Sequence, residues 1–166
     1  KKNYSKLLKE CKFRMKKKWK KNLNYNFLIK ECDKQKKISY NFLYNIIMHD
    51  LFFKKKNNDV ITWVEKNQLV WRQIPEFLRM FKKGKSILII RDPRSVLASF
   101  KKYTYNPGLI YLGAIFNCYD VMRTANKLKK NFGEKILVVK FEDLLVKKEV
   151  VLKKIYKFLN LSFKNI

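Results

Sequence analysis

Residues 87–100 read ILIIRDPRSVLASF, and their pattern of apolar, charged and proline residues is the strongest indication of the fold. Four consecutive apolar residues, Ile87–Ile90, are typical of a strand that is buried on both faces, as in a parallel sheet. Asp92 followed by Pro93 is a helix-start signature, because aspartate caps a first turn and the fixed φ of proline suits it. The stretch therefore predicts a strand that ends at Ile90 and a helix that begins at Pro93.

Similar short elements on both sides of this stretch indicate an α/β fold. The apolar runs predict strands at Val60–Val64, Ser86–Ile90 and Ile136–Val139. Helical spacing of apolar residues predicts helices at residues 3–21, 25–32, 39–53, 73–81, 93–103, 109–130 and 148–159. Ser39 is expected to cap the third of these, and the 109–130 helix is expected to stop before Gly133. Strands that alternate with helices predict a parallel sheet flanked by helices.

The composition indicates a class of binding partner but no particular one. Of 166 residues, 40 are Lys or Arg and 13 are Asp or Glu, which gives a formal charge of +27 and must attract polyanions. A basic module that binds nucleic acid or another polyanion without catalysis is therefore one candidate function. It explains the charge but not the order of strands and helices. No apolar run is long enough for a transmembrane helix.

Cysteine and histidine offer little material for a metal site. Cys11, Cys32 and Cys118 are widely spaced, and His49 is the one histidine. A zinc site or a Ser-His-Asp triad would need more of these residues or closer spacing. We expect inert thiols, a helix-surface His49 and no metal.

The residues that carry chemistry lie in the stretch 87–100. Arg91 follows the predicted strand and so stands at the carboxyl edge of the sheet, where open α/β folds bind ligands beside helix N-termini. Ser99 shares a helical face with Ser95 and would add a hydroxyl donor. A guanidinium and a hydroxyl beside a helix start suit a phosphate. The alternative is that Arg91 pairs with Glu142 or Asp143 and that the Ser99 hydroxyl bonds its own helix.

The pattern strand-R-D-P-R-x-x-x-x-S resembles the 3'-phosphate motif of sulfotransferases that use 3'-phosphoadenosine 5'-phosphosulfate (PAPS). The resemblance implies that Arg91 and Ser99 hold that phosphate. Three further stretches, one upstream and two downstream, agree in order. Residues 63–68 resemble the family's E-K-T-P segment, and residues 138–145 and 155–161 resemble its strand-Y-E-D-L segment and F-L-G-L helix. The resemblance extends over about residues 60–163.

The resemblance implies one sulfotransferase domain over residues 1–166, with a helical part at 1–58 and an α/β nucleotide-binding part at 59–166. The fold would be nucleotide-kinase-like. The family's first strand leads into a Gly- and Ser-rich phosphate loop, whereas the four glycines here stand at 84, 108, 113 and 133. We therefore expect a truncated domain that lacks this strand and loop and is inactive alone. Asn67 and Gln68 also replace the family's Thr and Pro.

The implied reaction transfers a sulfuryl group from PAPS to a hydroxyl or amine and leaves 3',5'-ADP. In the glycan-modifying members, the glutamate of the E-K segment is the base, so Glu65 is the candidate base and Lys66 the candidate charge stabiliser. The alternative for Glu65 and Lys66 is a solvated pair at a strand end. The abundant lysine suits an anionic glycan as acceptor, and a small alcohol, a lipid or a tyrosyl peptide is equally compatible with the sequence. Arg94 either stays on the helix surface or lends charge to the nucleotide, and no specific nucleic acid is expected.

Overall fold

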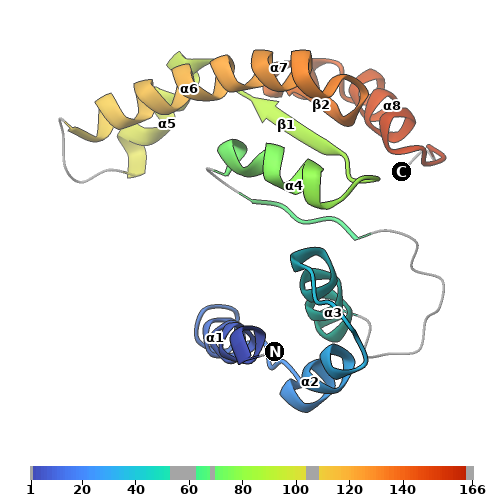
Figure 1. The fold of residues 1–166 in the computed structure, drawn as a ribbon. Helices are drawn as coiled ribbons and strands as arrows, with labels where there is room; N and C mark the ends of the chain where they lie inside the picture. The colour runs from blue at the N-terminus through green and yellow to red at the C-terminus, as the bar shows by residue number, and fades with distance from the viewer. Residues whose placement is uncertain (1, 53–62, 68–69, 104–108, 164–166) are drawn as a thin grey trace. The chain divides into compact units, whose positions relative to one another are not determined.

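The computed structural model describes residues 2–52, 63–67, 70–103 and 109–163, and Figure 1 colours them along the chain. The chain divides into two compact units, residues 1–66 and 67–166. The predicted boundary at residues 58 and 59 lies outside the described residues. Each unit has a buried core of its own.

Three helices form the first unit: α1 (Lys2–Trp19), α2 (Tyr25–Asp33) and α3 (Tyr40–Phe52). The predicted cap of α3 is confirmed, because Ser39 Oγ accepts a hydrogen bond from the Phe42 backbone N–H at 3.1 Å. Buried Asp50 accepts a hydrogen bond from the Asn24 backbone N–H at 2.6 Å and so ties α3 to the start of α2. The core of this unit consists of Leu8, Leu23, Leu28, Cys32, Leu43 and Ile46.

The second unit alternates helices with two strands. In chain order its elements are η1 (Trp71–Gln73), α4 (Ile74–Met80), β1 (Ser86–Ile90), α5 (Pro93–Tyr103), α6 (Leu109–Phe132), η2 (Gly133–Lys135), β2 (Ile136–Lys140), α7 (Phe141–Val146) and α8 (Lys148–Leu159). The strands pair in parallel, from Ser86 opposite Ile136 to Ile90 opposite Lys140. Both strands therefore place their carboxyl ends at the same edge of the sheet.

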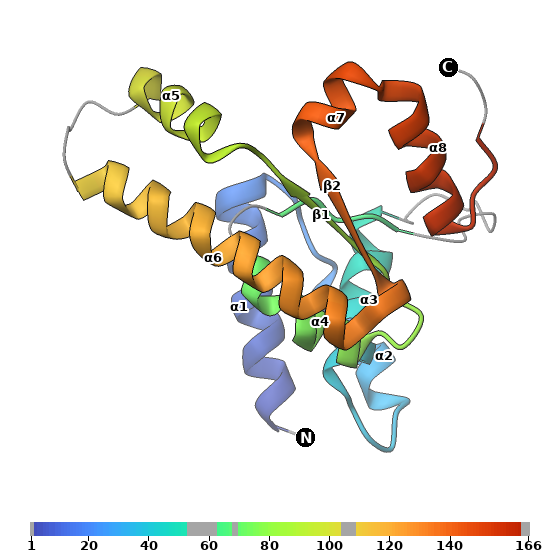
Figure 2. The ribbon, with the colours of Figure 1, turned by 90° about the horizontal axis from the view of Figure 1, so that it is seen from above.

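Helices pack on both faces of this two-stranded sheet, as the apolar strands predicted, although Ile89 of β1 stays 52% exposed. On one face Leu88 and Ile136 pack with Leu78 of α4 and with Ala125 and Leu128 of α6. On the other face, Leu137 and Val139 pack with Val151 of α8, joined by Ile87, Leu144, Ile155 and Phe158. Figure 2 shows α6 and α8 on either side of the strands. The α/β class with a parallel sheet flanked by helices is thus confirmed.

The bounds of most elements agree with the sequence patterns. The strand Ser86–Ile90 and the helices Pro93–Tyr103 and Lys148–Leu159 have the predicted ends. Helix α6 stops just before Gly133, whose φ of +46° is a conformation that suits glycine after a helix. No helix in the described ranges is both long and apolar enough to span a membrane.

Two patterns were misjudged. Residues 60–62 of the predicted Val60–Val64 strand lie outside the described residues, and Trp63 and Val64 are not part of a strand. The helix α7 was not predicted, because six residues directly after a strand are too few to show helical spacing.

Candidate functional site

The candidate site begins where the two parallel strands end. Ile90 and Lys140 are the last paired residues. The next residues in the same register are Arg91 opposite Phe141, and then Asp92 opposite Glu142. Beyond the strand ends, the chain enters α5 on one side and α7 on the other. The carboxyl edge of a parallel sheet beside a helix start is the usual ligand position in open α/β folds.

Asp92 caps α5, as predicted from the sequence. Its Oδ1 accepts a hydrogen bond from the Arg94 backbone N–H at 2.8 Å, and its carbonyl accepts the first helical bond, from the Val96 N–H at 3.0 Å. The Arg94 side chain first, and then the Arg94 backbone N–H, lower the pKa of Asp92 from 3.8 to about 2. The helix start therefore carries an ionised cap at any physiological pH.

The Arg94 side chain forms a fork-shaped contact with the Asp92 carboxylate through two of its nitrogens, and it lies on the surface. Its Nη2 donates to Asp92 Oδ2 at 2.7 Å, and its Nε lies 3.1 Å from Oδ1 and 3.3 Å from Oδ2. The Arg94 side chain is 90% exposed. Of the two alternatives for Arg94, the structure supports the helix-surface one.

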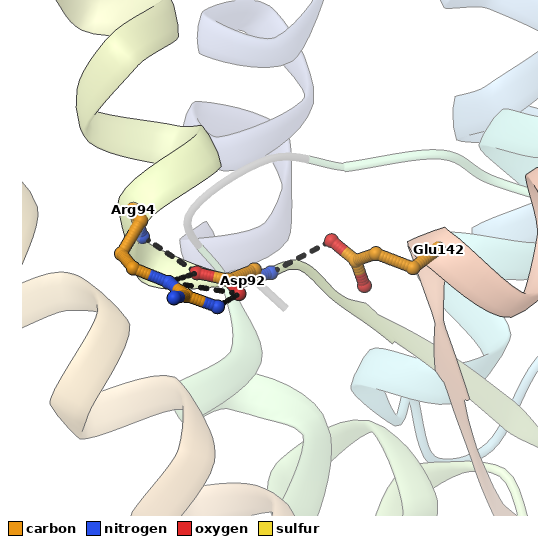
Figure 3. A network of polar contacts seen from close by, with 3 residues as sticks. All are labelled: Asp92, Arg94 and Glu142. Carbon is orange, nitrogen blue, oxygen red and sulfur yellow. Dashed lines mark hydrogen bonds and ion pairs between the residues drawn. The ribbon is translucent and has the colours of Figure 1, made fainter.

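Glu142 connects the two strand ends from the other side. Its Oε1 accepts a hydrogen bond from the Asp92 backbone N–H at 2.9 Å, and Figure 3 shows Asp92 held between Arg94 and Glu142. This backbone contact is the main reason why the pKa of Glu142 lies below its ordinary value of 4.5. Glu142 thus joins the ends of the two strands at the carboxyl edge of the sheet.

Arg91 is exposed, and its guanidinium lies over the ring of Phe141, 5.0 Å from the centroid. Arg91 forms no ion pair with Glu142 or Asp143, the alternative considered from the sequence, although its positive charge is one of the smaller causes of the lowered pKa of Glu142. Among the described residues, Arg91 forms no ion pair. Its donors can therefore bind an anion without breaking an existing ion pair.

Ser99 lies two turns into α5 and is half-buried. The alternative in which its hydroxyl bonds its own helix is not observed, since the hydroxyl has no hydrogen-bond partner in the described part of the chain. Ser95 precedes it by four residues and therefore lies on the same helical face. The position of Ser99 relative to a bound phosphate stays a prediction.

Glu65 and Lys66 belong to the first unit, whereas Arg91 and Ser99 belong to the second. Glu65 and Lys66 are both exposed. The Tyr44 hydroxyl of α3 donates a hydrogen bond to Glu65 Oε2, and the Tyr44 ring lies 5.2 Å from the ring of Trp63. The Glu65 carboxylate thus contacts α3, and the roles of Glu65 and Lys66 stay predictions.

A basic hollow of about 320 Å³ opens beside β2. Ile90 and Val138 line it from the strands, and α6 and α8 line its walls. Its charged lining residues are Lys129, Lys140, Lys154 and Asp143. None of these lysines forms an ion pair within the described ranges. The surroundings of the strand ends are thus cationic.

Sequence reasoning missed two aromatic residues. Phe141 lies in the segment 138–145 that resembles the strand-Y-E-D-L motif, but its place opposite Arg91 depends on the register of β1 with β2, which the sequence does not give. Tyr44 gave no signal, because its contact with Glu65 joins residues 21 positions apart.

The histidine and the cysteines occupy the expected structural positions. His49 is exposed on α3 and stacks on the ring of Phe27 at 5.9 Å. Burial raises the pKa of the thiols of Cys32 and Cys118. In the part of the chain that the structure describes, no three His, Cys, Asp or Glu residues gather as metal ligands.

Comparison with known proteins agrees with the motif at the strand ends. No curated protein and no solved structure matches the chain significantly. The family model described as "Sulfotransferase family" matches residues 2–165, which is nearly the whole sequence and includes both units. The chain therefore belongs to the sulfotransferase family.

Proposed function

We propose that this sulfotransferase uses PAPS as its donor and that Arg91 and Ser99 hold the 3'-phosphate of the nucleotide. The observation that carries the proposal is that Arg91, just past the end of β1, has a guanidinium available to bind an anion. Its guanidinium is exposed and without an ion-pair partner in the described ranges. The two neighbouring carboxylates are already engaged, Asp92 by Arg94 and Glu142 by a backbone N–H.

The donor chemistry of this edge fits a phosphate. A planar guanidinium offers paired N–H donors that match two phosphate oxygens. The hydroxyl of Ser99 can add one more donor. The start of α5 contributes partial positive charge, although the Asp92 carboxylate offsets part of it. Arg91 thus supplies one full unit of positive charge, in addition to the partial charge of the helix start.

In the proposed reaction, an acceptor hydroxyl or amine attacks the sulfur of PAPS. The bond between sulfur and the oxygen of the 5'-phosphate breaks, and 3',5'-ADP leaves. Glu65 takes the proton of the acceptor, and Lys66 stabilises negative charge on the sulfuryl or bridging oxygens. The hydrogen bond from Tyr44 supports this role, because it restrains the Glu65 carboxylate.

For the acceptor we propose an anionic glycan. The support is electrostatic: the chain has a formal charge of +27, and the hollow beside β2 is lined by three lysines and one aspartate. Such charge raises the local concentration of an anionic substrate and speeds its association. Adding salt should therefore raise the KM for an anionic acceptor more than for a neutral one.

Calorimetry with 3',5'-ADP and 5'-AMP tests the nucleotide site. The protein should prefer 3',5'-ADP, and Arg91→Ala should weaken its binding by more than about tenfold, because a charge-assisted contact contributes about 1.5 to 3 kcal/mol. Arg79→Ala is the matched control, since it removes an exposed arginine that pairs with Glu76 in the same unit. Equal affinity for both nucleotides, or equal effects of the two variants, would refute the assignment.

A further inference from the structure

Two side-chain contacts continue the strand register past the point where the strands end. The last backbone pair is Ile90 and Lys140. One residue further, the guanidinium of Arg91 lies over the ring of Phe141. One residue further again, the N–H of Asp92 donates to the carboxylate of Glu142. The segment that would carry the phosphate is thus aligned by the opposite chain.

The backbone geometry explains why the Asp92 N–H bonds to the Glu142 carboxylate. At Phe141 the second chain leaves the sheet and begins α7. Its carbonyls then point along the helix and can no longer accept from the neighbouring strand. The N–H of Asp92 would lose its ladder partner, and the carboxylate of Glu142 replaces it at 2.9 Å. This contact fixes the backbone immediately after Arg91.

The Phe141 contact acts on the side chain of Arg91. An exposed arginine normally samples many rotamers, and restricting them before a ligand arrives lowers the entropy lost on binding. The ring of Phe141 supplies such a restraint through its face, 5.0 Å from the guanidinium carbon.

We propose that Phe141 and Glu142 are positioning residues that hold Arg91 in the orientation that selects a 3'-phosphate. This inference rests on the proposed function of Arg91. It assigns neither residue a contact with the nucleotide, since Phe141 acts on the guanidinium and Glu142 on the backbone of Asp92.

Charge and position can be separated at Glu142. Glu142→Gln removes the negative charge but keeps an oxygen that can accept from the Asp92 N–H. Glu142→Ala removes the acceptor as well. If position matters, the two variants should differ, although both lose the same charge.

Calorimetry on the chain should measure the ratio of affinities for 3',5'-ADP and 5'-AMP in each variant. Glu142→Ala and Phe141→Leu should lower this ratio about threefold to tenfold, the usual effect of losing one such contact. Glu142→Gln should keep or raise the ratio. Leu145→Ala, at a residue of α7 that is 67% exposed, should change nothing. A merely structural role would leave the ratio unchanged.

A spectroscopic measurement makes the test independent of affinity. In the NMR spectrum, the ring of Phe141 should shift the Arg91 Nε–H signal upfield, and Phe141→Leu should abolish this shift. If Glu142→Ala does not fold, the NMR shift of Arg91 and the nucleotide affinities of Phe141→Leu still test the proposal. No effect of Arg91→Ala would refute the proposed function. An effect of Arg91→Ala with unchanged ratios in Phe141→Leu and Glu142→Ala would refute the positioning role alone.

Discussion

Arg94→Ala should raise the pKa of Asp92 from about 2 toward its ordinary value of 3.8. The guanidinium of Arg94 makes three contacts with the Asp92 carboxylate, at 2.7, 3.1 and 3.3 Å, and it is the largest cause of the low pKa. The Arg94 backbone N–H is the second cause and persists in the variant. The pKa should therefore stop short of 3.8.

The carboxyl carbon shift of Asp92, followed by NMR from pH 6 to pH 1.5, measures this pKa directly. Arg94→Lys should give an intermediate value, because lysine keeps the charge but loses the fork. Arg123→Ala removes an exposed arginine of α6 and is the matched control, expected to leave the titration of Asp92 unchanged. An unchanged pKa in Arg94→Ala would show that the fork is not populated in solution.

The same change should alter stability at acid pH with a defined sign. The pKa of Asp92 is lower in the folded chain than in the unfolded one, so its contribution to stability is complete above about pH 4. It is lost as the pH falls through the folded-state value of about 2. Because Arg94→Ala raises that value, the loss should be complete at higher pH in the variant. Identical acid-unfolding curves would contradict the reasoning.

Three further predictions concern the base, the core and the thiols. In a preparation that transfers sulfate, Glu65→Gln should lower the rate by at least about a hundredfold and leave 3',5'-ADP affinity unchanged, which kinetics and calorimetry would check. Retained turnover would remove Glu65 from the mechanism. Leu128→Ala should lower the free energy of unfolding, measured with urea, by about 2 to 5 kcal/mol, because Leu128 is only 2% exposed. Leu112 is 52% exposed, so Leu112→Ala should lower it by less than about 0.5 kcal/mol. Equal losses would contradict the described core. Cys118 should react with iodoacetamide far more slowly in the folded than in the unfolded chain, since burial raises the pKa of its thiol; equal rates would mean that it is accessible.

Local patterns were sufficient for the elements that carry the site. The apolar run before Arg91 and the Asp92-Pro93 pair gave the end of β1 and the start of α5 correctly. Both signals act within a few residues, as capping and burial do. The pattern at Val60–Val64 was less informative, because five apolar or β-branched residues do not specify a pairing partner. Trp63 and Val64 accordingly show no strand pairing.

The amino-acid sequence was enough to predict the α/β class, the capped start of α5 and the position of Arg91 after a buried strand. It left open whether Arg91 pairs with the acidic residues of the Phe141–Asp143 segment. Only the tertiary structure decided this, because Asp92 and Glu142 are 50 residues apart. Their meeting depends on the register of β1 with β2. That register places the Phe141 ring beside Arg91 and the Glu142 carboxylate beside the N–H of Asp92. The second contact satisfies a backbone donor that would otherwise have no partner at the end of the strand.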